Sequence, residues 1–138
     1  MKPTLQPGLE ASISVVVDER LTVPAVSSAF PGFDEMPPVF ATAFMVGFAE
    51  AAAMAVIADH LDDGESTVGI EVAFDHTAAT PVGMTVTADA TLTSVDGRIL
   101  IYDITLRDEV DRIGTGTHKR AVINRERFME RVAAKAGR

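Results

Sequence analysis

The sequence predicts an α+β fold in which a curved antiparallel sheet wraps around one long central helix. Two observations carry this prediction. Residues 40–58 form a single long apolar segment within a predicted helix over 40–61, and four strand-like segments joined by short turns follow it. Strands with short connections must pair antiparallel. The 138 residues make one domain, 1–138, which is long enough to bury its own core.

The first half of the chain supplies a strand, a loop and the helix. Alternating apolar residues predict a strand over 10–17. Four prolines within residues 24–38 exclude a long helix or a central strand there, and the apolar side chains between them predict a lid-like loop with a short helical turn. Residues 40–61 are apolar on nearly every side, as expected of a helix enclosed by other elements. Gly64 follows at its end.

The second half predicts four more strands, over residues 67–74, 84–95, 98–107 and 112–123. In the first of them, alternation places on one face Val68, Ile70, Val72 and Phe74. Asp96-Gly97 is a strong hairpin signal between the middle two strands. Asn124 is a suitable cap for an amphipathic C-terminal helix over 124–136.

A helix that is apolar all round must be covered. A sheet curved around it, the hotdog arrangement, is the economical solution. One such sheet still leaves a free edge and part of the helix uncovered. Two copies with their sheets side by side would cover both, so we expect a homodimer.

Composition excludes several classes of function. The absence of cysteine excludes a disulfide scaffold, a thiolate nucleophile and a cysteine-bound metal, and it fits a cytoplasmic protein. A net charge of −8 and the absence of tryptophan argue against nucleic-acid binding. Three histidines spread 16 and 42 residues apart make only a weak metal signal. Residues 40–58 are long enough to span a membrane, but Glu50 at their middle would cost at least ~2.5 kcal/mol there. We also find no signal peptide, and we expect no membrane association.

The charge is unevenly distributed along the chain. Residues 119–138 carry seven basic and two acidic side chains, a net charge of +5, which leaves −13 on residues 1–118. This segment is either a well-solvated basic helix or a binding site for a phosphorylated ligand.

Glu50 is the most informative single residue, because it is the only ionisable group in the apolar segment. It either faces a partner subunit or lines a functional cleft. His76 follows a strand end, and a carboxylate with an imidazole is the minimal set for acid–base chemistry on an ester or thioester. As an alternative, His76 is a surface residue. Thr42 lies eight residues before Glu50, which separates them by about 12 Å along a helix, so they could flank one elongated ligand.

Three further positions carry weaker signals. Gly69 interrupts a strand and predicts a bulge or a close backbone approach, where an N–H could hold an oxyanion. Arg120, beside Lys119, suits either a phosphate contact or a solvated charge pair. His118 is interpreted as a residue on the strand surface. The sequence has no Gly-x-Ser-x-Gly elbow and no phosphate-binding glycine loop.

Three blocks of sequence resemble the fluoroacetyl-CoA thioesterase family, a group of hotdog proteins: residues 39–50 (VFATAFMVGFAE), 75–81 (DHTAATP) and 113–123 (IGTGTHKRAVI). The similarity runs from Pro31 to Phe128, about 70% of the chain. The resemblance implies a homodimer with active sites at the subunit interface. It also implies that the substrate is an acyl-CoA and that no further cofactor is required.

The resemblance further implies roles for individual residues. The catalytic set would be Thr42, Glu50 and His76. Gly69, through its backbone, and Arg120 would contact the acyl-CoA.

In the family, the loop that corresponds to residues 24–38 forms a lid over the acyl pocket. Phe33 fits the family pattern. Met36 departs from it, since the fluoroacetyl-specific enzyme has a phenylalanine there that helps to select the fluorinated acyl group. The resemblance therefore supports thioesterase chemistry more strongly than fluoroacetyl specificity.

The sequence thus predicts an acyl-CoA thioesterase acting on a short acyl group. Glu50 would activate water or attack the thioester, His76 would transfer a proton and Thr42 would orient the substrate. Two alternatives remain: a hotdog hydratase or dehydratase acting on an acyl thioester, and a non-catalytic acyl-CoA binding module.

Overall fold

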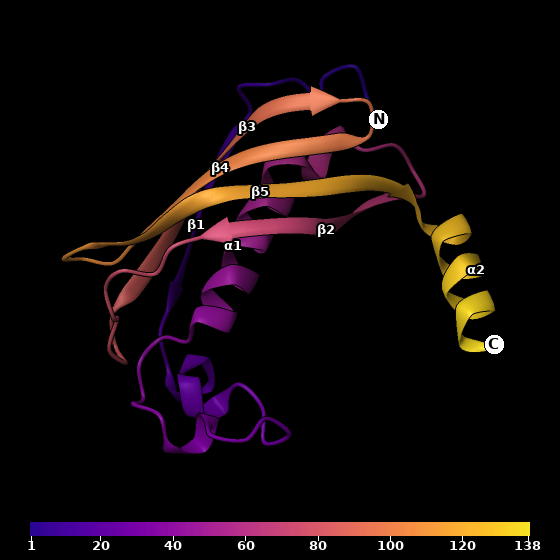
Figure 1. Ribbon diagram of the computed structural model, residues 1–138. Coiled ribbons are helices and arrows are strands. Elements are labelled where there is room, and N and C mark those ends of the chain that lie inside the picture. The colour runs from indigo at the N-terminus through magenta and orange to yellow at the C-terminus, as the bar shows by residue number, and fades with distance from the viewer.

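A five-stranded antiparallel sheet, in the order β1-β3-β4-β5-β2, curves around one long helix (Figure 1). The computed structural model describes all residues, 1–138. The elements are β1 (Glu10–Val16), α1 (Thr42–Ile57), β2 (Glu65–Phe74), β3 (Thr85–Asp96), β4 (Ile99–Arg107), β5 (Arg112–Asn124) and α2 (Arg125–Ala136). Every neighbouring pair of strands is antiparallel. The predicted α+β class and the sheet curved around a central helix are confirmed.

Helix α1 packs one face into the concave side of the sheet. The buried residues of this face are Met45, Ala49, Ala52, Ala53, Val56 and Ile57. Three of the six are alanines, whose small side chains allow the helix axis to lie close to β3 and β4. The opposite face is only partly covered, and Met54 is 43% exposed. As expected, the sheet of one chain leaves part of this helix uncovered.

By length and composition alone, the helical stretch Thr42–His60 could cross a membrane. Core helices of soluble proteins share that property, and in this structure the helix packs against the inner face of the sheet.

Strand β2 contains a bulge that changes which residues face the helix. Its register against β5 shifts between Gly69 and Glu71, so that Ile70 is an extra residue. A bulge of one residue reverses the alternation beyond it. The prediction of four apolar residues on one face is therefore wrong. Thr67 and Gly69 face α1 before the bulge and Val72 and Phe74 after it, since they pair with Val122, Arg120, His118 and Gly116 of β5.

Residues 24–38 form no long helix and no strand, as their prolines predict. They contain only short 3-10 turns, η2 (Val23–Ala25) and η3 (Phe33–Glu35), with the rings of Phe30 and Phe33 edge to face at 5.8 Å. In Figure 1 this segment lies beyond the N-terminal end of α1, far from α2. The predicted cap of α2 is confirmed, because the Asn124 side chain accepts a hydrogen bond from the Arg127 N–H.

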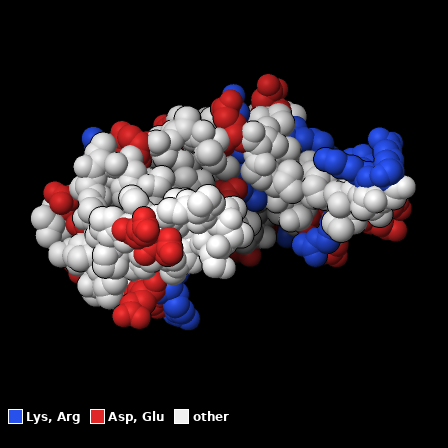
Figure 2. Space-filling model, turned by 60° about the horizontal axis from the view of Figure 1, so that its bottom comes forward, with Lys and Arg blue, Asp and Glu red and all other residues white.

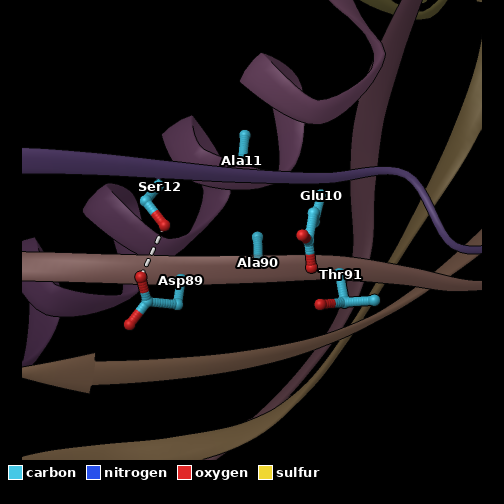
Figure 3. A pocket seen from close by; sticks show the side chains of 6 residues that line it. All are labelled: Glu10, Ala11, Ser12, Asp89, Ala90 and Thr91. Atoms are coloured by element: carbon cyan, nitrogen blue, oxygen red, sulfur yellow. Dashed lines mark hydrogen bonds between the residues drawn. The ribbon is translucent and has the colours of Figure 1, made fainter.

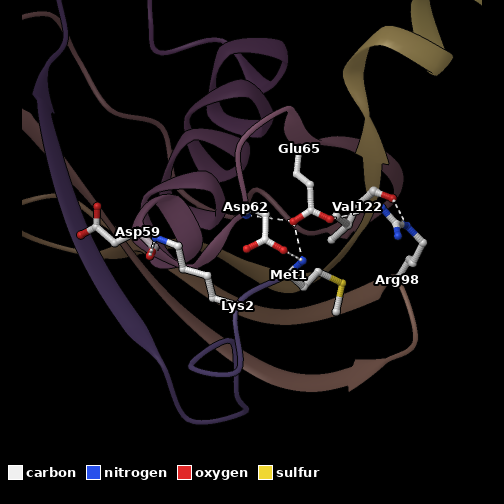
Figure 4. A network of polar contacts seen from close by, with 7 residues as sticks. All are labelled: Met1, Lys2, Asp59, Asp62, Glu65, Arg98 and Val122. Atoms are coloured by element: carbon white, nitrogen blue, oxygen red, sulfur yellow. Dashed lines mark hydrogen bonds and ion pairs between the residues drawn. The ribbon is translucent and has the colours of Figure 1, made fainter.

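A polar cluster ties the N-terminal segment to the loop after α1 (Figure 4). The Met1 ammonium group contacts Asp62 at 2.7 Å and also Glu65, and Glu65 contacts Arg98 at 3.3 Å. The Lys2 ammonium group donates to the Asp59 carbonyl oxygen. Exposed pairs of this kind contribute little individually, but they connect three segments that are distant in sequence.

Asp108 organises the turn between β4 and β5, and its removal should destabilise the fold. Its Oδ1 accepts hydrogen bonds from the N–H groups of Val110 and Asp111, and its Oδ2 accepts one from the buried Thr80 hydroxyl, all at 2.8 Å. We expect Asp108→Ala to lower the free energy of unfolding by about 3 kcal/mol, measured by urea denaturation, because three donors lose a charged acceptor. Asp108→Asn keeps the Oδ1 acceptor and should lose clearly less. Equal losses in the two variants would contradict this role.

Candidate active site

Glu50 lies at the middle of α1 and is paired across the core with β5. Its Oε1 accepts a hydrogen bond from Arg120 Nη1 at 3.0 Å. The Glu50 side chain is 35% exposed, whereas that of Arg120 is 5% exposed. No protein group hydrogen-bonds to the second carboxylate oxygen, Oε2. The carboxylate is therefore held through one oxygen, while about a third of the side chain stays exposed.

Arg120 is held on every side by protein groups. Its Nε donates to the Thr67 hydroxyl at 2.9 Å and its Nη2 to the Thr67 carbonyl oxygen at 3.0 Å. The interpretation of Arg120 as half of a solvated charge pair is wrong, because the residue points inward. Lys119, one position earlier, points to the outer face, where it pairs with Glu71 at 3.4 Å.

His118 completes this cluster, and its assignment to the strand surface is wrong. Its side chain is fully buried, and its ring stacks on Tyr102 with the centroids 6.2 Å apart. Nδ1 lies 2.7 Å from the Glu71 carbonyl oxygen and so donates to it, which leaves Nε2 as an acceptor 3.2 Å from Arg120 Nη1. Burial lowers the pKa of His118, and the nearby Arg120 charge lowers it further.

The inward orientation of His118 was not evident from the sequence, because four consecutive polar residues, 117–120, show no alternation with apolar residues. Residues 118 and 120 alternate with 117 and 119 in the strand, and the inward set continues to the apolar Val122. Extending the alternation back from Val122 would have placed His118 and Arg120 in the interior.

Gly69 lies where the Glu50 carboxylate approaches the backbone of β2. A Cβ atom at this position would overlap Glu50 Oε1 and would lie 3.3 Å from the His118 ring. The predicted bulge at Gly69 is confirmed. The group that approaches the backbone here is a side chain of the protein itself. An alanine here would displace the carboxylate from its present position.

The free side of Glu50 opens into a hollow of about 300 Å³ beside the edge strand β2. Its lining residues are Val46, Glu50, Gly69, Ile70, Glu71 and Val72. Ile70 and Val72 are each about half exposed, at 50% and 49%. A carboxylate thus borders an uncovered apolar surface at the edge of the sheet.

Thr42 and His76 form a second group, as a hydrogen-bonded pair. Thr42 Oγ1 lies 2.8 Å from His76 Nδ1, and His76 Nε2 is buried without a hydrogen-bond partner. Burial lowers the pKa of His76, although the Ala78 backbone and the Asp75 charge act in the opposite direction. The resulting neutral ring can accept or donate one proton. The pair borders a hollow of about 260 Å³ that Phe40 also lines.

Within one chain the two groups are not joined. Thr42 and Glu50 are separated by eight residues of α1, about 12 Å of helix rise, and no hydrogen bond connects Glu50 with Thr42 or His76. A second, apolar hollow of about 260 Å³ lies beside α1, near the Thr42 end. Neither Phe33 nor Met36 lines any hollow of the single chain, and Met36 is 48% exposed.

The largest hollow, about 490 Å³, lies on the outer face of the sheet between β1 and β3 (Figure 3). It is an open depression lined by Glu10, Ser12, Asp89 and Thr91 with two alanines, and the Ser12 hydroxyl donates to Asp89. It contains no histidine and lies on the opposite side of the sheet from Glu50. The structure also has no group of three or more His, Asp or Glu side chains that could hold a metal ion.

Comparison with known proteins gives this geometry a context. The family described as fluoroacetyl-CoA-specific thioesterase matches residues 17–126. The chain belongs to this family. A curated member, the fluoroacetyl-CoA thioesterase of Streptantibioticus cattleyicolor, is 44% identical over 135 residues, which are 98% of this chain and 97% of that protein. The resemblance inferred from the three sequence blocks is confirmed.

Solved structures of thioesterases share the fold over nearly the whole chain. A variant of the fluoroacetyl-CoA-specific thioesterase, solved with fluoroacetate and CoA, is 44% identical and superposes with a TM-score of 0.87, covering 90% of this chain and 99% of that chain. A thioesterase-superfamily protein of Thermus thermophilus is 26% identical with a TM-score of 0.85, covering 98% of both chains. The hotdog fold is thereby confirmed.

The buried His118 and the half-buried His76 predict a loss of stability below neutral pH. Their pKa values are lower in the folded chain than in the unfolded chain, where histidine titrates near ~6.5. The unfolded state therefore binds more protons as the pH falls, and the free energy of unfolding decreases, by about 1.4 kcal/mol per unit of pKa difference. Urea denaturation at pH 7.5 and pH 5.5 measures this decrease. His118→Gln should show a smaller decrease, and a wild-type stability that stays constant or rises would contradict the prediction.

Proposed function

We propose that the protein hydrolyses a short-chain acyl-CoA to the free acid and CoA, with Glu50 as the reacting carboxylate. The supporting observation is the position of Glu50. Its Oε1 is bound to the buried Arg120 and lies against Gly69, and the residue lines a hollow beside the edge strand β2. The chain is a member of a family of thioester hydrolases. Protein groups and water suffice for this reaction, CoA is part of the substrate, and we place the reaction in the cytoplasm.

In this proposal Glu50 acts through Oε2. As general base, it takes a proton from water while the water oxygen attacks the thioester carbonyl carbon. The C–S bond then breaks, and the CoA sulfur leaves with a proton. As nucleophile, it attacks the same carbon, the C–S bond breaks and the CoA sulfur leaves and takes up a proton, and water then cleaves the resulting anhydride to the free acid and the Glu50 carboxylate. In both routes a backbone N–H at Gly69 would stabilise the oxyanion.

Arg120 and His118 support Glu50 in this reaction. Because Arg120 is bound to Thr67 and Glu50, we propose that it contacts the acyl-CoA at the thioester end. His118 is proposed as a positioning residue, since its Nε2 accepts from the Arg120 nitrogen that also binds Glu50. A buried network of this kind limits the guanidinium to one orientation.

The Thr42–His76 pair and the loop over 24–38 complete the proposed site. His76, as a neutral imidazole, would transfer a proton, and Thr42 would orient the substrate or the ring. The loop would act as a lid that covers the acyl group with Phe33 and Met36. Methionine is flexible and adaptable, so Met36 should admit acyl groups of other shapes than a phenylalanine would.

We propose that the active site is completed at the interface of a homodimer. Strand β2 is at the edge of the sheet, and its exposed Ile70 and Val72 border the Glu50 hollow. Pairing of two β2 strands would extend the sheet, cover these residues and enclose the hollow. It would also place residues of a second copy beside Glu50, whose own chain leaves it apart from Thr42 and His76.

Glu50→Gln should abolish hydrolysis without unfolding the protein. We expect CoA thiol release to fall at least ~100-fold, because glutamine neither accepts the proton nor attacks the thioester. The substrate panel contains acetyl-, fluoroacetyl-, propionyl-, branched short-chain, medium-chain and phenylacetyl-CoA. Glu19→Gln makes the same change at an exposed position remote from the site and should retain wild-type turnover.

Three results would contradict the proposed function. Near-normal thiol release by Glu50→Gln would remove Glu50 from the reaction. Saturable binding of the panel by the wild-type protein without thiol release would identify a binding module. Conversion of the acyl group without thiol release would identify a hydratase or dehydratase.

Val72→Asp should disrupt the proposed dimer. A charge at this edge position would be buried against a second copy, so we expect a monomer by light scattering and a loss of thiol release. Val110→Asp is the matched control, because Val110 is 72% exposed in the turn after β4. A monomeric wild-type protein would contradict the proposed dimer. If Val72→Asp remains a fully active dimer, the β2 edge is not the interface.

A further inference from the structure

A hollow of about 330 Å³ lies where β5 passes into α2, outside the site described above. Its lining residues are Arg98, Val122, Ile123, Asn124, Arg127 and Arg131. Arg98 comes from the turn between β3 and β4, whereas Arg127 and Arg131 lie four residues apart on one face of α2. We call this site the arginine hollow. Three guanidinium groups from two separate parts of the chain converge on it.

Two of these guanidinium groups have no anionic partner. Arg127 and Arg131 form no ion pair, although Glu126 and Glu130 lie on the same helix. Arg98 is held in place, because its Nε donates to the Val122 carbonyl oxygen at 3.0 Å and its Nη2 pairs with Glu65 at 3.3 Å. The hollow thus combines one fixed arginine with two that lack an anionic partner, of which Arg131 lies over the Phe128 ring at 6.0 Å. Arginine binds phosphate through two parallel hydrogen bonds.

The arginine hollow lies in a basic segment of a chain that is acidic as a whole. The chain has a net charge of −8, but its last twenty residues have a net charge of +5. Figure 2 shows the basic side chains gathered over the projecting α2 end, while acidic side chains are scattered over the remaining surface in view. A polyanionic ligand is repelled by most of the molecule and attracted to this end.

The other basic residues of β5 are unavailable to phosphate. Arg120 is buried in its contacts with Thr67 and Glu50, and Lys119 pairs with Glu71 on the outer face. From Arg120 to Asn124 the strand rises about 13 Å, a span that an extended pantetheine arm bridges. A thioester beside Glu50 therefore leaves the nucleotide end of CoA within reach of α2.

We propose that the arginine hollow binds the phosphate groups of the adenine nucleotide portion of CoA, with Arg127 and Arg131 as the principal contacts and Arg98 as a fixed support. This inference rests on the proposed function, because it concerns the same substrate. In this proposal the basic segment, residues 119–138, recognises the nucleotide portion of the substrate, while Glu50 acts on the thioester at a separate place.

The double variant Arg127→Gln/Arg131→Gln tests the inference through two substrates. With acetyl-CoA, or with the panel member that is turned over best, we expect kcat/KM to fall at least about tenfold, through KM with kcat unchanged. With the corresponding acyl-pantetheine, which lacks the nucleotide, we expect no change. The matched control is Arg125→Gln/Arg138→Gln, which removes the same charge from positions outside the hollow and should change KM less than twofold. All four side chains are exposed, so the variants should fold, as circular dichroism will verify.

Binding of adenosine 3′,5′-bisphosphate, measured by calorimetry, provides a readout independent of catalysis. We expect saturable binding to the wild-type and control proteins and at least a tenfold weaker Kd for the Arg127/Arg131 double variant. Unchanged KM and Kd, or equal losses in the control variant, would overturn the inference, as would an equal loss with acyl-pantetheine. If no acyl-CoA is hydrolysed, the proposed function fails, and the bisphosphate measurement still decides whether the hollow binds nucleotide phosphates.

Discussion

The ion pair between Glu50 and Arg120 is the constraint on which the rest of the interior depends. A carboxylate in an apolar helix and a guanidinium on the inner face of a sheet would each be costly alone. Together they connect α1 to β5. Thr67 accepts from the other two nitrogens of the guanidinium, and His118 shares the nitrogen that binds Glu50. The position of the helix relative to the sheet is therefore fixed by polar geometry as well as by apolar packing.

The bulge in β2 makes this arrangement possible. Without the extra residue at Ile70, the strand could not present Thr67 and Gly69 to the polar cluster and also turn Val72 toward the Glu50 hollow and Phe74 toward the core. This irregular point of the sheet thus lies beside the carboxylate of Glu50. Bulges are frequently found beside functional sites, where they redirect side chains locally while the rest of the strand stays paired.

Local patterns in the sequence were sufficient to predict most of the fold. Alternation placed all five strands within two residues of their observed bounds, and the long apolar segment predicted α1. The helix ends at Ile57 and continues as a 3-10 turn to His60, close to the predicted end at 61. The face of β2 was predicted wrongly, because the bulge depends on pairing with β5, a partner about fifty residues away.

The candidate site was only partly accessible to sequence reasoning. Glu50 stood out as a lone charge, and Gly69 as an interruption in a strand, so both were found. The pairing of Glu50 with Arg120 and the burial of His118 were not predicted. The spacing of residues along a helix gives their relative directions, but it does not show that β5 is the strand that faces Glu50. The hydrogen bond between Thr42 and His76 likewise joins residues 34 positions apart.

The close approach of Glu50 to Gly69 also restricts the order in which this site can change during evolution. Any side chain at position 69 collides with the carboxylate as long as a glutamate occupies position 50. A substitution at 69 therefore becomes acceptable only after residue 50 has been shortened or turned away, whereas a substitution at 50 does not require a change at 69. The two positions are therefore coupled, and even without the carboxylate a side chain at position 69 would still press on the ring of His118 and a nitrogen of Arg120.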